Sequence, residues 1–314
     1  MEKDAKIYVA GHNGLLGSAI KRRLERDGFS NIICRSSSEL DLRNQSVVED
    51  FFRRERPEYV FDAAAKVGGI QANMNFGADF IYDNLQIQTN LIHFSYKYGV
   101  KKFVFFGTNC MYPKDYEQPM KEEDMLSGAF EPTNEPYAVA KVAGFKMCQA
   151  YRKQYGCDFI SIVPASLYGP YDNFDAASCH LIPALIRKFH DGKVEGKEFV
   201  ELWGTGKPRR EFLFIDDVAD AVMFLVENYK SGELINVGYG EDYSILEIAN
   251  IVKEVVGFKG EIRHDLSKPD GMMRKFLDSG RMKRMGWEAK TNLRDGVRKT
   301  YEYFLENEIF LFHK

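Results

Sequence analysis

The sequence predicts an α/β fold built on a doubly wound parallel sheet, with a second, smaller α/β lobe. Short apolar runs alternate with amphipathic segments through the first half of the chain, which is typical of βαβ units around a parallel sheet. A glycine-rich turn directly follows the first apolar run. Turn-rich segments at residues 169–173 and 204–208 then interrupt this rhythm and indicate the second lobe.

The expected strands and helices follow in order along the first half. Strands are predicted over residues 7–10, 31–34, 58–65, 102–106 and 158–164, and helices over 14–28, 78–98 and 136–155. We expect one domain from residues 1–165 with about 212–240, and the smaller lobe from about 166–211 with 241–314. Ligands of such sheets bind at the carboxyl ends of the strands, so a site is expected at that edge.

The composition excludes several classes of protein. The 314 residues include 45% hydrophobic side chains, enough apolar surface to offset the chain entropy lost on folding. The 43 basic and 46 acidic residues give a net charge of 43 − 46 = −3, which provides no field for wrapping nucleic acid. No apolar stretch approaches the roughly 20 residues that span a bilayer, and the first six residues do not resemble a signal peptide.

The cysteines indicate a reducing compartment. There are five, at positions 34, 110, 148, 157 and 179, with no CxxC pair and no zinc-ligand spacing. An odd set without paired spacing is typical of cytosolic proteins, so we expect a cytoplasmic location and no metal site. Cys179 is interpreted as a small buried hydrophobe.

The glycine turn predicts a dinucleotide site. Gly11, Gly14 and Gly17 lie in the run AGHNGLLG at residues 10–17. Missing side chains allow a tight turn and let a pyrophosphate approach the backbone and the N–H groups of the following helix. An ordinary strand-to-helix turn is the alternative, but the flanking strands favour a Rossmann-type cofactor site. Asn13, Leu15 and Leu16 are included in it as neighbours in the turn.

The end of the second strand favours NADP over NAD. An NAD site usually has an acidic residue there, which accepts hydrogen bonds from the ribose 2′-hydroxyl. This chain has Arg35 and Ser36 instead, a cation and a hydroxyl that can bind a 2′-phosphate. The alternative for Arg35 is an exposed surface cation. Asp41 and Leu42, just beyond, are expected to flank the adenine.

A tyrosine and a lysine four residues apart indicate ketone chemistry. Tyr137 and Lys141 share one face of the predicted helix. Tyrosine has an ordinary pKa of about 10 and transfers protons poorly near neutrality, and we expect the Lys141 ammonium to stabilise the phenolate. Thr108 follows a predicted strand and can hydrogen-bond a substrate carbonyl beside the phenol. A chance pair of residues is the alternative.

Longer motifs complete a family resemblance. The chain resembles the GDP-L-fucose synthases among the extended short-chain dehydrogenases/reductases, within the NAD-dependent epimerase/dehydratase family. The diagnostic runs are AAAKVGGI at 63–70, EPTNEPYA at 131–138, LYGP at 167–170, REFL at 210–213 and SKPDG at 267–271. The resemblance covers nearly the whole chain.

The resemblance implies a substrate, a cofactor and two reactions. The substrate is a GDP-4-keto-6-deoxy sugar, whose C3 and C5 are epimerised before NADPH reduces C4. It implies Cys110 and His180 as the acid and base of epimerisation, with Tyr137 and Thr108 donating to the substrate oxygen. It also implies that Ala63, Ala64, Ala65, Pro164, Lys141 and His180 contact the cofactor.

Substrate-holding residues and a partner are implied in the same way. The candidates for the sugar, the guanine and the diphosphate are Asn109, Lys188, Trp203, Arg210, Lys268 and Asp270. Solvated surface charge is the alternative for the two lysines. The resemblance further implies a homodimer formed through helices of the nucleotide domain.

Three departures from the family pattern leave other functions open. Asn109 stands where a serine is common, Asn13 and Ser37 stand where some members have arginine, and residues 165–166 replace a Thr-Asn pair. An alternative function is therefore C4 reduction without epimerisation of a related GDP-4-keto sugar, such as a heptose. A non-catalytic NADP-binding protein is another.

Overall fold

The predicted parallel sheet is the centre of the molecule. The computed structural model describes residues 1–175, 179–268 and 270–311, so Pro269 of the SKPDG run lies outside the described residues. Six parallel strands run in the order β10-β5-β4-β3-β1-β2. They are β1 (Ile7–Ala10), β2 (Ile32–Ile33), β3 (Tyr59–Asp62), β4 (Lys102–Phe106), β5 (Phe159–Pro164) and β10 (Leu234–Val237).

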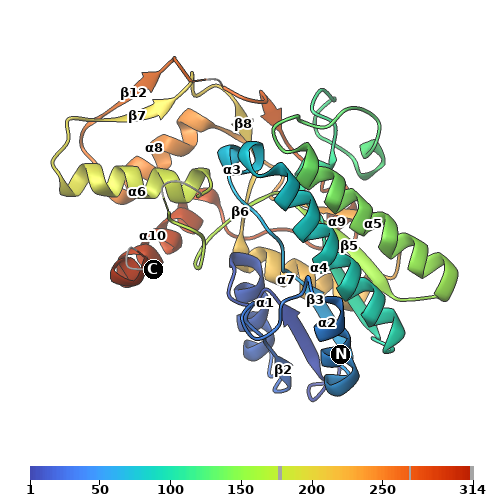
Figure 1. Ribbon diagram of the computed structural model, residues 1–314. Helices are drawn as coiled ribbons and strands as arrows, with labels where there is room; N and C mark the ends of the chain where they lie inside the picture. Colours follow the sequence, from blue (N-terminus) through green and yellow to red (C-terminus); the bar gives the residue numbers. More distant parts are fainter. Residues whose placement is uncertain (176–178, 269, 312–314) are drawn as a thin grey trace.

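Helices cover both faces of this sheet, which confirms the doubly wound fold. On one face α1 (Leu15–Arg26) packs against α7 (Ile215–Asn228). On the other, α4 (Gly77–Lys97) packs between α2 (Gln45–Glu55) and α5 (Glu135–Tyr155), as Figure 1 shows. Every residue of β1, β4 and β5 is buried, as expected for strands with helices on both sides.

Two elements differ from the sequence-based expectation. Helix α2 was not predicted, although Val48, Phe51 and Phe52 bury one helical face at spacings of three and four residues. Strand β3 ends at Asp62 rather than at residue 65. The three alanines that follow, at 63–65, lie outside the sheet and line a cavity. Their small side chains suit this position, because the backbone of Ala63 and Ala64 lies against Gly11.

A second group of elements lies beyond the carboxyl ends of the large sheet (Figure 1). Its helices are α6 (Leu181–Val194), α8 (Ile245–Val256) and α10 (Leu293–Leu311). Its strands are β6 (Ser166–Tyr168) paired with β9 (Phe212–Phe214), β7 (Phe199–Trp203) paired with β12 (Glu261–Asp265), and β8 (Arg209–Arg210) between β11 (Tyr243–Ser244) and β13 (Arg274–Lys275). Four short helices lie elsewhere, against the large sheet and the helices that cover it. They are α3 (Ile70–Asn75), α9 (Gly280–Arg284), η1 (Asn109–Met111) and η2 (Glu122–Asp124).

The apolar core is divided into two clusters. The larger surrounds the six-stranded sheet and includes Leu277 and Trp287 from the C-terminal part. The smaller contains Phe212 and Phe214 together with side chains of α6, α8 and α10. The lobe boundaries drawn from the sequence stay a prediction. None of the described helices combines the length and the apolar character needed to cross a bilayer.

Strand order fixes where a ligand can bind. Strand β1 lies between β2 and β3. The connection after β1 therefore runs to β2 on one side of it, and the connection after β2 crosses to β3 on the other side. Such a reversal opens a crevice outside the carboxyl ends of the two strands, which is where doubly wound sheets bind ligands. Gly11 follows β1 and Ala63 follows β3 at this point.

Glu211 joins the two groups of elements. Glu211 is the residue between β8 and β9 in the sequence. Its buried carboxylate accepts hydrogen bonds from the backbone N–H groups of Gly240 (2.8 Å) and Leu277 (3.1 Å). Burial raises the pKa of Glu211 to about 7, although these N–H groups and that of Tyr239 oppose the shift. The carboxyl therefore titrates near neutrality inside the folded protein.

This shift predicts a pH-dependent stability. The unfolded chain loses the Glu211 proton near the ordinary value of 4.5, well before the folded chain does. Ionisation thus favours unfolding, and the Glu211 contribution is lost as the pH rises from about 4 to about 8, by about 3 kcal/mol. Urea unfolding should show wild type losing this amount relative to Glu211→Gln over that interval. Parallel pH curves for the two proteins would contradict the shift.

Candidate active site

A cavity of about 1930 Å³ runs along the carboxyl ends of the sheet strands and into the second group of elements. Most residues predicted for a site line it. They are Gly11, Asn13, Gly14, Leu15, Leu16, Arg35, Ser36, Asp41, Leu42, Ala63, Ala64, Ala65, Thr108, Asn109, Cys110, Tyr137, Lys141, Pro164, His180, Trp203, Arg210 and Asp270. Gly17, Lys188 and Lys268 lie outside the lining.

The glycine turn is shaped as a dinucleotide cradle. A Cβ on Gly11, whose φ is +74°, would lie 2.6 Å from the carbonyl oxygen of Ala63, and one on Gly17 would lie 2.2 Å from that of Gly11. Gly14 caps α1 without a side-chain hydrogen bond, and the first turn holds no acidic residue. The N–H groups there remain available to a diphosphate, so this turn fits the cofactor.

Arg35 and Ser36 line the cavity, but each already has a carboxylate partner. Arg35 donates to Glu55 (3.1 Å) and to the carbonyl of Cys34 (2.8 Å). The Ser36 hydroxyl donates to Glu39 (2.7 Å). A 2′-phosphate bound at this end would compete with two carboxylates for these donors.

Tyr137 and Lys141 lie on one face of α5, as predicted, but their electrostatics differ from the expectation. Burial, with the negative charge of Cys110 and Asp62, raises the pKa of Tyr137. The Lys141 Nζ atom lies 4.9 Å from the centre of the Phe105 ring. Because burial is the largest cause of the raised Tyr137 pKa, the expected lowering of the phenol pKa is wrong.

Asp62 was missed by the sequence analysis. It ends β3, is buried, and lies in register with Phe105, so its side chain is on the face over which Lys141 lies. Burial raises the pKa of Asp62 to about 6, and the Lys141 ammonium opposes this shift. The backbone N–H of Ala64 also opposes this shift. Among the described residues, neither oxygen of the Asp62 carboxylate has a hydrogen-bond partner of good geometry. The signal for Asp62 in the sequence is an aspartate at the end of an apolar strand.

Cys110 has two donors directed at its sulfur. The Asn134 Nδ2 atom lies 3.1 Å from Sγ, and the Lys275 Nζ atom lies 3.4 Å from it. The backbone N–H of Cys110 donates to the Thr108 hydroxyl at 3.4 Å. Lys275, also missed, comes from β13, 165 residues further along the chain, where no local pattern links it to Cys110.

His180 caps α6 at the cavity wall, with Asp172 behind it. The Asp172 carboxylate is buried, and its Oδ1 atom lies 3.9 Å from His180 Nδ1. Asp172 raises the pKa of His180 by attracting the protonated imidazole, while burial opposes the shift. The residue before Asp172, Tyr171, has φ of +70°, a conformation rare outside glycine, so the loop is held in an uncommon shape here.

The far end of the cavity combines an indole with cations. Trp203 is exposed, and the ammonium groups of Lys188 and Lys268 lie 5.2 and 5.5 Å from its ring. Arg210 lines the cavity, its guanidinium donates to the carbonyl of Arg209 (2.7 Å), and burial lowers its pKa. The two lysines thus flank the predicted guanine contact although they do not line the cavity.

Asp270 and Asn109 hold neighbouring segments. The Asp270 carboxylate accepts hydrogen bonds from the Thr205 N–H and hydroxyl, both at 2.7 Å. Asn109 donates to the Ser166 hydroxyl at 3.4 Å, so two of the positions that depart from the family pattern contact each other. Over the described ranges, no three His, Cys, Asp or Glu side chains converge where they could hold a metal ion.

Fold and site together define an NAD-dependent epimerase or reductase of nucleotide sugars. Residues 7–238 match the model of the NAD dependent epimerase/dehydratase family, and the chain belongs to that family. The family resemblance drawn from the motifs is confirmed.

Individual proteins similar to this chain have more specific activities than the family description gives. The chain is 54% identical over 306 residues to GDP-L-fucose synthase 1 of Arabidopsis thaliana, covering 98% of this chain and 95% of that protein. Among solved structures, it is 40% identical to a GDP-6-OMe-4-keto-L-xylo-heptose reductase from C. jejuni (TM-score 0.93; 98% and 99% covered). It is 30% identical to a GDP-L-fucose synthetase from Naegleria fowleri bound to NADP (TM-score 0.92; 98% and 95% covered).

The His180 contact gives a direct prediction. Replacing Asp172 by Asn removes the carboxylate that favours the imidazolium, so the His180 pKa should fall toward or below 6.5. Histidine NMR titration, with the signal assigned through His180→Gln, measures the shift. Asp191→Asn is the control, because Asp191 is on the same helix but pairs with Arg187 (3.7 Å). An unchanged His180 pKa in Asp172→Asn would contradict the contact.

Proposed function

We propose that this chain is an NADPH-dependent enzyme that converts GDP-4-keto-6-deoxy-D-mannose to GDP-L-fucose by 3,5-epimerisation and C4 reduction. One observation carries the proposal: Tyr137, Cys110 and His180 line one cavity together with the glycine turn. The 54% identity to a GDP-L-fucose synthase over nearly the full chain supports the same substrate.

One ketone explains why both reactions can share a pocket. Protons on the carbons beside a carbonyl are acidic because the carbanion left behind is stabilised as an enolate. Cys110 and His180 serve as the acid and base that exchange these protons, and Asn134 and Lys275 hold the sulfur of Cys110 in place. Tyr137 and Thr108 donate to the sugar oxygen that carries negative charge in both reactions.

Reduction needs a hydride and a proton. NADPH, when bound on the glycine turn, supplies the hydride to C4. Tyr137 then donates its proton to the C4 oxygen, which completes the alcohol. The raised pKa of Tyr137 keeps this proton in place until the oxygen becomes basic. Lys141 lies one helical turn beyond Tyr137 on α5 and would contact the bound cofactor.

The GDP part of the substrate occupies the far end of the cavity. Trp203 offers an exposed aromatic face for the guanine, and Lys188 and Lys268 stand beside the ring. Arg210 is the cation for the diphosphate, since it lines the cavity and its guanidinium donates to a backbone carbonyl, that of Arg209 (2.7 Å).

Reaction in heavy water tests this function. With NADPH and the GDP-4-keto-6-deoxy sugar, the product should carry solvent deuterium at C3 and C5, as mass spectrometry and NMR would show. The second candidate, C4 reduction of a related GDP-4-keto heptose without epimerisation, is supported by the 40% identity to the C. jejuni reductase. Product formed without deuterium at either carbon would favour that candidate over epimerisation.

Two substitutions should separate the reactions. Tyr137→Phe should slow reduction by roughly 10²–10⁴-fold, the usual contribution of a general acid, whereas Cys110→Ser should mainly impair deuterium exchange. Reduction is followed by NADPH oxidation and exchange by NMR. Equal loss of both reactions in folded Cys110→Ser would contradict the division of roles.

We propose a cytoplasmic homodimer built on α4 and α5. These neighbouring helices expose the large side chains of Tyr82, Tyr96, Val139 and Tyr155, and exposed apolar side chains of this size can pair with a second copy. The rings of Tyr96 and Tyr155 stack at 4.1 Å between centroids. The five free cysteines suit a reducing compartment.

Sedimentation tests the dimer. Wild type should sediment as a dimer at micromolar concentration, and Tyr96→Asp should shift it to a monomer by placing charge in the contact. Val194→Asp is the control, because Val194 is exposed at the end of α6, away from α4 and α5. A monomeric wild type would refute the proposal.

A further inference from the structure

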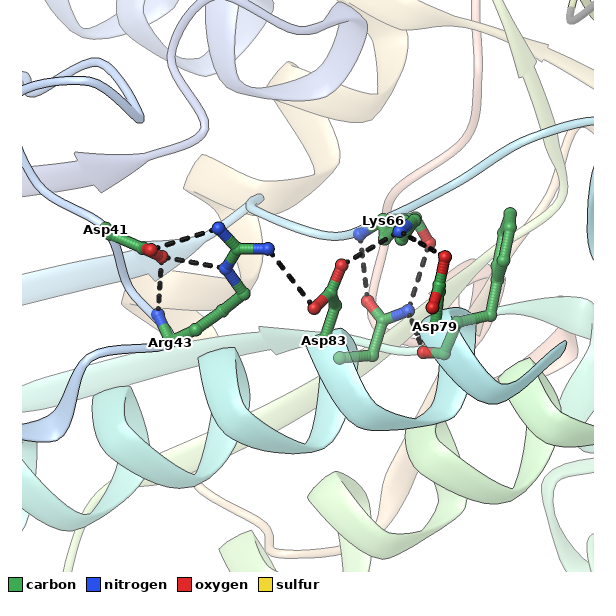
Figure 2. A network of polar contacts seen from close by, with 7 residues as sticks. Asp41, Arg43, Lys66, Asp79 and Asp83 are labelled. Carbon is green, nitrogen blue, oxygen red and sulfur yellow. Dashed lines mark hydrogen bonds and ion pairs between the residues drawn. The ribbon is translucent and has the colours of Figure 1, made fainter. Parts of the chain in front are cut away.

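A line of five charged side chains runs beside the cavity, from the loop after β2 to the start of α4. Figure 2 shows Asp41, Arg43, Asp83, Lys66 and Asp79 along it. The guanidinium of Arg43 stands between two carboxylates. It donates to Asp41 Oδ1 from Nε (2.9 Å), to Asp41 Oδ2 from Nη2 (3.0 Å) and to Asp83 Oδ1 from Nη1 (3.3 Å).

Asp83 is a fixed support for Arg43. Its side chain is only 12% exposed and lies on α4, and its second oxygen accepts from Lys66 Nζ at 3.0 Å. The next residue, Asn84, holds the backbone of Lys66 through its side-chain amide, with both contacts at 3.0 Å. The Arg43 side chain, in contrast, is 49% exposed. A solvent-accessible guanidinium is therefore held by a buried partner.

The orientation of these contacts restricts what Arg43 can bind. All three side-chain contacts use the edge of the planar group, so its flat faces are not occupied by them. Two carboxylates also compensate the positive charge of Arg43, whereas Arg35 has one carboxylate partner, so Arg43 is the weaker phosphate ligand of the two. A planar guanidinium with satisfied edges stacks well on an aromatic ring.

The position of Arg43 indicates which ring it meets. Arg43 lines the cavity together with Asp41, Leu42 and Ile87, at the end that also holds Arg35. We propose that the Arg43 guanidinium is the platform on which the adenine of the dinucleotide stacks, held flat by Asp41 and Asp83. This inference rests on the dinucleotide site of the proposed function. Arg43 serves the base, and Arg35 serves the 2′-phosphate.

Binding of two adenine nucleotides tests the platform without any turnover. 5′-AMP and 2′,5′-ADP share the base and differ in the 2′-phosphate, and calorimetry measures the affinity of each. Arg43→Ala should weaken both by the same factor, about fivefold for an exposed stacking contact. Arg35→Ala should weaken 2′,5′-ADP alone. Arg43→Lys keeps the charge but loses the plane, so it should behave like Arg43→Ala.

A control and the contrary results complete the test. Arg53→Ala removes an arginine that pairs with Asp50 on α2 and should leave both affinities unchanged. Circular dichroism establishes that each variant is folded. Three results would overturn the inference: wild-type affinities in Arg43→Ala, a loss confined to 2′,5′-ADP, or full affinity in Arg43→Lys. Wild type that binds neither nucleotide would instead refute the dinucleotide site itself.

Discussion

The close approach of three backbones beneath the cavity is the constraint on which the rest of the structure depends. The carbonyl of Gly11 lies where a Cβ on Gly17 would be, and the Ala63 carbonyl lies where one on Gly11 would be. This contact brings the ends of β1 and β3 against the first turn of α1, at the reversal of strand order. Without it the amides of α1 would not face the cavity, and the alanines after β3 would not line it.

The reactive side chains share one design: each meets a partner from another part of the chain. Lys141 lies near Asp62 of β3, Cys110 contacts Lys275 of β13, and His180 faces a buried aspartate in the loop after β6. These contacts link the reactive side chains to β3, β13 and the loop after β6, so their placement depends on the fold as a whole.

The sequence predicted the parts of this arrangement that local pattern encodes. The glycine spacing, the Tyr137–Lys141 pair and the apolar strands depend on neighbours within a few residues, and the structure brings them to one sheet edge as predicted. Lys275 and Asp172 act across long separations or through a turn, and neither leaves a local signature. The expected electrostatics of Tyr137 were wrong because residue spacing gives a shared helix face but not the depth of burial, and burial is what raises the pKa of the phenol.

The pairing of β13 with β8 links two parts of the site. Lys275, whose ammonium lies 3.4 Å from the sulfur of Cys110, is the register partner of Arg210, which lines the cavity. Register partners on adjacent strands lie side by side. One small sheet therefore fixes the spacing between the cation beside the thiol and the arginine assigned to the diphosphate, and a slip of one residue in that pairing would disturb both ends of the substrate site at once.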